Sequence, residues 1–243
     1  MSANLRRYLS WQARDFVIER GLSILIVSAL IVIQIVLVVR ARSQAFSIGF
    51  DPKVARQLFV DAGDLLCFIA TLIATSGMVN NDRKNGWFRF LFSKPVVVPA
   101  YYAQSFVVNG VGMVVCLTIV AFAYGLLLAP VLSLGTIAWF ALYYLAAGGI
   151  SFFLSAATRW DWLSLSAVWF GAKGIHASLP PSESALGRVL ELILPPSFLS
   201  GDLGAHFVAG TQHSWNSIAW LGGYGLVAFV AGLVVLRHRQ LGR

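Results

Sequence analysis

Long apolar runs alternate with short polar segments along the 243-residue chain. A run of about 18 or more residues with few charges is long enough to cross a bilayer as a helix. The runs therefore predict six membrane-spanning helices, at residues 21–39, 61–79, 101–129, 133–158, 162–179 and 217–236. The second run reaches spanning length only if Asp61 and Asp64 lie at the membrane interface. The pattern predicts an all-α integral membrane protein with a single domain over residues 1–243.

Residues 1–20 precede the first apolar run and have a helical period of their own. On a helix, apolar residues share one face and basic residues share the other; the apolar face holds Leu5, Tyr8, Leu9, Ala13 and Phe16. A helix of this kind lies in the plane of the membrane interface. We therefore expect an interfacial N-terminal helix.

The longest connection, residues 180–215, precedes the last run. Its apolar part, residues 186–194, is too short to cross a membrane. Pro195 and Pro196 follow it and would end a helix. This outer segment is therefore expected to hold a short re-entrant or surface helix.

Composition and charge support the membrane assignment, since the chain is 58% hydrophobic and only 12% charged. The net charge is +8, but the basic residues flank apolar runs, which favours membrane anchoring over nucleic acid as a partner. If the N-terminus is cytoplasmic, twelve lysines and arginines lie inside and five lie outside. This excess predicts that both termini are cytoplasmic.

Few residues have the pattern of a catalytic or metal-binding site. The chain has no phosphate-binding G-x-x-x-x-G-K-[ST] loop, no H-E-x-x-H and no C-x-x-C, so we expect neither ATP nor a metal to bind this chain itself. Lys173 lies inside the fifth run, where it either reaches outward to the head groups or contacts a substrate or partner helix. Asp61 and Asp64 share a helix face, as solvated residues near a helix start or as a contact for a substrate or a cation.

The segment "NDRKNGWFRFLFSKPV", residues 81–96, connects the second and third runs and is amphipathic. On a helix over residues 82–94, polar residues including Asp82 and Arg89 fall on one side. The opposite side holds Trp87, Phe88, Phe90, Leu91 and Phe92, and Pro95 ends the helix. A cytoplasmic helix of this design rests on the membrane or the spans and presents its polar edge to another protein.

This segment resembles the cytoplasmic loop of type-2 ABC transporter permeases, which reads E-R-E-x-G-T-L-x-x-L-L-x-x-P-[VI] after the second span. The matching positions are Asp82, Arg83, Gly86, Leu91, Phe92, Pro95 and Val96. Lys84 replaces an acid, Trp87 replaces a threonine, and Gln104 stands where a lysine is common. An interfacial first helix, six spans and a short outer helix are also typical of that family, so the resemblance extends over nearly the whole chain.

The resemblance implies a membrane-spanning subunit of an ATP-driven exporter in the plasma (bacterial inner) membrane. Such a subunit pairs with a second copy or a homologue and binds separate cytoplasmic ATPase chains, which hold ATP and Mg²⁺. Residues 82–94 would be the coupling helix, with ATPase contacts from Asp82, Arg83, Lys84, Gly86, Trp87, Arg89 and Pro95.

Two alternatives remain open on the sequence alone. The chain could be a helical membrane scaffold or assembly protein that transports nothing. It could also be an intramembrane enzyme that uses Lys173 or the two aspartates, Asp61 and Asp64.

Overall fold

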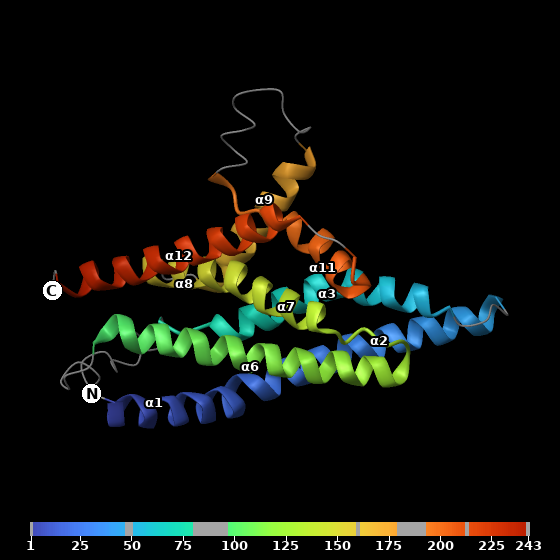
Figure 1. Cartoon of the computed structure of the whole chain (residues 1–243), viewed down its shortest axis with the longest axis horizontal. Helices are drawn as coiled ribbons and strands as arrows, with labels where there is room; N and C mark the ends of the chain where they lie inside the picture. The colour runs from blue at the N-terminus through green and yellow to red at the C-terminus, as the bar shows by residue number, and fades with distance from the viewer. Residues whose placement is uncertain are drawn as a thin grey trace.

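The computed structural model describes residues 2–46, 51–79, 97–158, 161–178, 193–211 and 214–241 (Figure 1). All regular elements within these residues are helices. They are α1 (Ser2–Asp15), the π-helix η1 (Phe16–Gly21), α2 (Leu22–Phe46), α3 (Pro52–Thr75), α6 (Val98–Leu127), α7 (Leu134–Tyr143), the π-helix η2 (Tyr144–Gly148), α8 (Gly149–Ala157), α9 (Asp161–Ser178), α11 (Leu199–Ala209) and α12 (Trp215–Leu241).

Five helical stretches of the described residues are long and apolar enough to cross a membrane. They are Tyr8–Ala41, Pro52–Thr75, Val98–Leu127, Leu134–Ala157 and Trp215–His238. Helices of spanning length are thus confirmed at five of the six predicted spans. The bounds of the second were wrong, because its helix begins at Pro52 and ends at Thr75, so Asp61 and Asp64 lie within it and not near its start. The fourth of these runs through α7, η2 and α8 without a break in the helix. Residues 162–178 of the remaining predicted span, 162–179, belong to the helix α9, which is too polar for this set because it holds residues such as Lys173 and His176. A sixth crossing therefore stays a prediction.

The N-terminal helix α1 leads directly into α2 through the π-turn η1 rather than ending before the first span. Its inner face contacts α6, because the rings of Tyr8 and Tyr101 meet edge to face with centroids 6.2 Å apart. Phe16 is buried against Gly112 of α6, where an added Cβ would lie 2.2 Å from the phenyl ring. The predicted amphipathic face is thus used in part for packing on α6. Leu9, which shares that predicted face, is 51% exposed.

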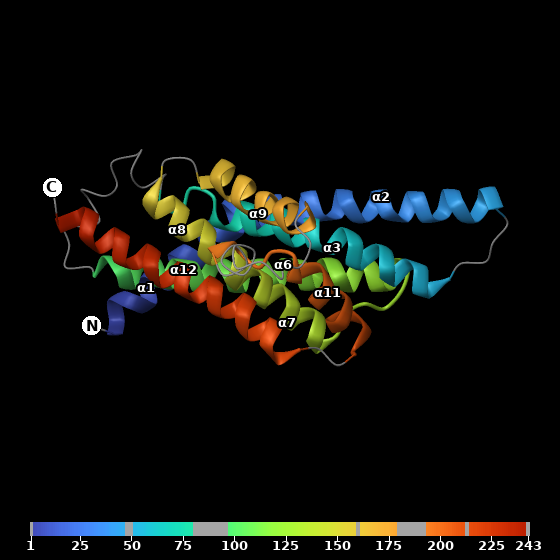
Figure 2. The ribbon, with the colours of Figure 1, turned by 90° about the horizontal axis from the view of Figure 1, so that it is seen from above.

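The bundle is held together by close contacts between helices at glycines. On α8 and α12, Gly149 and Gly225 leave no space for side chains: a Cβ on Gly149 would lie 2.1 Å from the Gly225 carbonyl oxygen, and one on Gly225 would lie 2.2 Å from the Leu145 carbonyl oxygen. Small residues of this kind let helix backbones approach closely in membranes, where the hydrophobic effect does not hold helices together. Figure 2 shows α12 lying along α7 and α8.

Both termini lie at one end of the bundle, and α3 ends and α6 begins toward that same end (Figure 1). The end of α2 and the start of α3 lie at the opposite end. This agrees with the predicted order of crossings, in which the segment after the second span shares a side with both termini. The predicted coupling helix, residues 82–94, lies outside the described residues.

The helix predicted at residues 186–194 stays a prediction, and the outer segment contains a further helix that the sequence did not indicate. Residues 179–192, which contain most of the predicted helix, lie outside the described residues, and the helix that the structure describes is α11, which begins after Pro195 and Pro196. The turn before α11 is fixed by hydrogen bonds from Ser197 N to Pro195 O (2.7 Å) and from Leu199 N to Pro196 O (3.1 Å). The two prolines are buried, so this turn packs into the bundle.

Candidate functional site

Asp64 and Lys173, singled out in the sequence, form an ion pair in the structure. Lys173 Nζ of α9 donates to Asp64 Oδ2 of α3, and 109 positions separate the two residues in the chain. The side chains are 19% exposed for Asp64 and 27% exposed for Lys173. Asp64 lies near the middle of the 24-residue helix α3. The pair therefore places one charge near the middle of a candidate span and the opposite charge on the neighbouring helix α9.

Ser200, at the start of α11, contacts the other oxygen of the Asp64 carboxylate. Its Oγ lies 2.5 Å from Asp64 Oδ1 and 2.7 Å from the Ser197 carbonyl oxygen, and its single proton can serve one acceptor at a time. Ser197 Oγ donates to the carbonyl oxygen of Trp169 on α9 (3.0 Å). The turn before α11 therefore joins α3 to α9 through two buried serines.

Trp139 of α7 supports this turn from the side. Its indole Nε1 donates to the Ser200 carbonyl oxygen (3.1 Å). The ring fits between Gly63 of α3 and Gly204 of α11, where an added Cβ would lie 2.6 Å and 2.5 Å from it. Three helices thus meet at the residues beside Asp64, and the two glycines make room for the indole that holds Ser200.

Aromatic side chains line the neighbouring part of α9. Trp169 is fully buried, with its ring 5.3 Å from that of Tyr143 and 6.5 Å from that of Phe68, centroid to centroid. The rings of His176 and Phe198 stack 3.6 Å apart at 10°. Contacts from α3, α7 and the turn before α11 therefore fix the rotation of α9 that points Lys173 at Asp64.

Two buried polar atoms lie in this aromatic wall, the Tyr143 hydroxyl and the Trp169 indole nitrogen. The two groups interact with each other, although without a well-aligned hydrogen bond. They therefore belong to the packing of α7 against α9. The site as a whole offers a carboxylate and an ammonium next to an apolar wall.

Asp61 does not join the pair, although it shares a predicted face with Asp64. It is exposed, and its carboxylate accepts a hydrogen bond from Gln57 Nε2 at 2.9 Å. The three possible site residues are therefore divided by the structure into a bonded pair and a separate surface acid. The other predicted positions, Asp82, Arg83, Lys84, Gly86, Trp87, Arg89 and Pro95, lie outside the described residues.

Ser197, Ser200 and Trp139 were not predicted as site residues. Serines are common in outer loops, and nothing in the segment after the two prolines indicates that it turns into the bundle. The nearest signal is the pair of glycines, Gly63 beside Asp64 and Gly204 beside the turn, which mark a close approach of another side chain.

Chemically, the site can bind or exchange a charged partner, and a metal is a poor fit. The Asp64 carboxylate is already bonded to the Lys173 ammonium, and no group of three metal-ligating side chains occurs in the described part of the chain. A charge pair inside a span is costly and is often functional.

Comparison of the chain with protein-family models, with curated proteins and with solved structures gives no match. Its function is therefore inferred from its own geometry and sequence pattern.

Proposed function

We propose that this chain is the membrane-spanning permease subunit of an ATP-driven ABC exporter in the plasma membrane, working as a dimer with separate cytoplasmic ATPase chains. The observation that carries the proposal is the position of α3. This helix ends toward the bundle end that holds both termini, just before the segment that resembles a coupling helix, and it carries Asp64 at its middle (Figure 1). One helix thus connects the segment that would bind the ATPase with the charged site.

The C-terminal turn of α3 is hydrogen-bonded to neighbouring helices, so a displacement of α3 would be transmitted to them. Arg20 Nη1 donates to the Ala74 carbonyl oxygen (2.7 Å), which ties η1 to the last turn of α3. Thr75 Oγ1 lies 2.8 Å from Ser151 Oγ, which ties the same turn to α8. A push on residues 80–96 would therefore move α3 together with the first and fourth spans, as a coupling mechanism requires.

The Asp64–Lys173 pair is the part of the pathway that such a movement would change. Sliding α3 against α9 by one helical turn, about 5.4 Å, would separate the carboxylate from the ammonium. Each charge would then be free to contact a polar or charged group of the substrate. In the arrangement that the structure shows, the two charges contact each other instead.

The enzyme alternative has less support. The Lys173 ammonium and both oxygens of the Asp64 carboxylate already have partners within the bundle, so neither group is open to a substrate in this arrangement. The scaffold alternative predicts the same bundle without an ATPase partner, so the presence or absence of that partner distinguishes the two functions.

Co-purification tests the proposal directly. The tagged chain, extracted from its native membrane in mild detergent, is expected to bring down a chain that binds ATP. Arg83→Glu and Gly86→Pro should release that chain, because they reverse a charge on the docking edge and break the coupling helix. Arg56→Glu makes the same charge change at the opposite end of the bundle and should retain the partner.

Thermal unfolding of each variant shows whether the membrane chain itself is intact. Loss of an ATP-binding partner from the two coupling variants alone supports the proposal. If no such chain co-purifies, or if Arg56→Glu releases it equally, the permease assignment is wrong. The enzyme alternative would instead require that Lys173→Ala abolish a chemical turnover that needs no ATP.

A further inference from the structure

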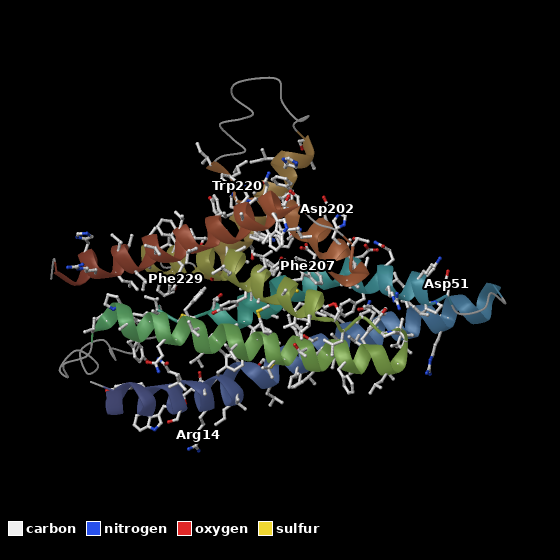
Figure 3. All side chains as sticks on the ribbon, viewed as in Figure 1. Arg14, Asp51, Asp202, Phe207, Trp220 and Phe229 are labelled. Carbon is white, nitrogen blue, oxygen red and sulfur yellow. The ribbon has the colours of Figure 1, made fainter. Side chains whose placement is uncertain are left out.

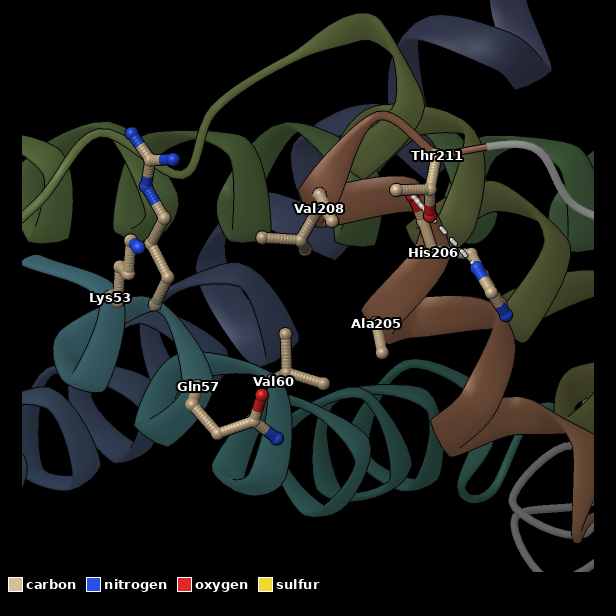
Figure 4. A pocket seen from close by; sticks show the side chains of 9 residues that line it. Lys53, Gln57, Val60, Ala205, His206, Val208 and Thr211 are labelled. Atoms are coloured by element: carbon tan, nitrogen blue, oxygen red, sulfur yellow. Dashed lines mark hydrogen bonds between the residues drawn. The ribbon is translucent and has the colours of Figure 1, made fainter.

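A second polar site lies between the first turns of α3 and the end of α11, at the bundle end opposite both termini (Figures 1 and 4). It is an open cavity of about 360 Å³. Its lining residues are Lys53, Arg56, Gln57 and Val60 of α3, and Ala205, His206, Val208, Ala209 and Thr211 at the end of α11. Asp64 and its ion pair do not line this cavity, so it is separate from the site described above.

The cavity carries positive charge that the described residues leave uncompensated. Neither the Lys53 ammonium nor the Arg56 guanidinium has a hydrogen-bond or ion-pair partner among those residues. Both lie in the first turns of α3, where the helix dipole adds further positive potential. Of the nearby acids, Asp51 accepts from the Lys53 backbone N–H (2.9 Å) and Asp61 accepts from Gln57. The first turn of α3 contains no acid of its own.

The opposite wall of the cavity is largely apolar. Val60, Ala205 and Val208 form its floor and far side, and Figure 4 shows Lys53 and Gln57 facing Ala205 and Val208 across the gap. His206 Nδ1 lies 2.8 Å from Thr211 Oγ1 at the edge of this wall. A cavity with cations on one side and aliphatic side chains on the other is suited to an amphiphilic anion.

Both walls are held in place. The Tyr124 hydroxyl of α6 donates to the Ala55 carbonyl oxygen (2.6 Å), and the rings of Tyr124 and Phe59 lie 4.9 Å apart, which fixes the turn that carries the cations. On the other side, Gly210 ends α11 with φ at 67°, a conformation that glycine adopts without strain. The cavity is therefore a feature of the folded bundle that does not need a ligand to form.

We propose that this cavity binds the phosphate head group of an anionic lipid. Lys53 and Arg56 would contact the phosphate oxygens, with Arg56 able to donate two parallel hydrogen bonds. The glycerol and the first part of the acyl chain would lie on Val60, Ala205 and Val208. A free phosphate ion has the same charge chemistry but makes no use of the apolar wall. This inference stands whether or not the chain is a transporter.

Lipid-binding titrations of the purified full chain test the proposal. A fluorescent phosphatidylglycerol is added to the chain in neutral detergent, with phosphatidylcholine as the uncharged reference and inorganic phosphate as competitor. The wild-type chain should prefer phosphatidylglycerol. Lys53→Gln and Arg56→Gln should each weaken its binding about fivefold, the effect expected for one cation near a lipid phosphate.

Arg40→Gln is the matched control, because it removes one positive charge from the same end of the bundle without touching the cavity. With Arg40→Gln, the affinity for phosphatidylglycerol should stay within about twofold of the wild-type value. Ala205→Phe keeps every charge but fills the cavity, and it should weaken lipid binding while the thermal unfolding temperature stays close to the wild-type value.

The two sets of variants separate the outcomes. A lipid site is supported if phosphatidylglycerol binding is weakened by Lys53→Gln, Arg56→Gln and Ala205→Phe but not by Arg40→Gln, and if inorganic phosphate does not displace the lipid from the wild-type chain. Equal losses with Arg40→Gln would show that only the overall charge attracts lipid, and would overturn the proposal. Binding of inorganic phosphate with no preference for phosphatidylglycerol would overturn the lipid assignment.

Discussion

At the scale of single residues, the environment of Asp64 explains why a carboxylate is tolerated near the middle of a candidate span. An isolated carboxylate in a bilayer is costly, but Asp64 has an ammonium on one oxygen and a serine hydroxyl on the other. Each partner comes from a different helix, α9 or α11. The carboxylate is therefore the point at which three segments distant in sequence are joined.

Removing one member of the pair should destabilise the chain more than removing both. Asp64→Asn leaves the Lys173 ammonium without a counter-charge, and Lys173→Met leaves the Asp64 carboxylate without one. Each should lower the free energy of unfolding by an amount on the order of 3 kcal/mol. The double variant removes both charges and should recover most of the loss. Thermal unfolding in detergent measures this double-mutant cycle, and additive losses in the double variant would show that the two charges do not interact.

The sequence identified both members of the pair but not the contact between them. Lys173 and Asp64 were predicted as site residues because charged residues are rare in apolar runs. Their partnership depends on the packing of α3 against α9, and no periodicity relates positions 109 apart. The helical period also grouped Asp61 with Asp64, because residues three apart share a face. The structure separates them, since α9 and α11 cover only part of that face.

At the scale of helices, apolar runs predicted most of the spans but gave no sign of the helix α11. Five runs correspond to helices of spanning length, because a long apolar run has few alternatives in lipid. The helix α11 was missed, since two prolines precede it and it contains two glycines, Gly201 and Gly204, a composition that indicates a loop. Its formation depends on tertiary contacts, such as the hydrogen bond from Trp139 to Ser200, that lie beyond any local pattern.

The contact of α12 with α7 and α8 should depend on single glycines. Gly225→Ala would place a methyl group 2.2 Å from the Leu145 carbonyl oxygen, so α12 must move away, at a cost of about 1–3 kcal/mol. Gly223→Ala, two residues earlier on the same helix, meets no atom within 4 Å and should leave stability unchanged or slightly higher. Thermal unfolding of the two variants compares them, and equal effects would contradict the packing described for α12.

At the scale of the whole molecule, the two ends of the bundle differ in their chemistry. One end holds both termini and the flanks of the segment that resembles a coupling helix, and the other holds the basic cavity between α3 and α11 (Figure 3, in which Arg14 and Asp51 lie toward the two ends). The helix α3 runs between the ends and carries the Asp64 charge at its middle. In our proposal, ATPase chains act at the first end, and the spans respond through α3.

The mass of the intact complex tests the central claim most directly. Native mass spectrometry of the complex extracted from its own membrane measures which chains accompany this one. The permease proposal predicts two membrane subunits, each this 26.4 kDa chain or one of them a homologue, together with two copies of a chain that binds ATP. A mass that corresponds to this chain alone, as a monomer or as an oligomer without an ATP-binding partner, would contradict it.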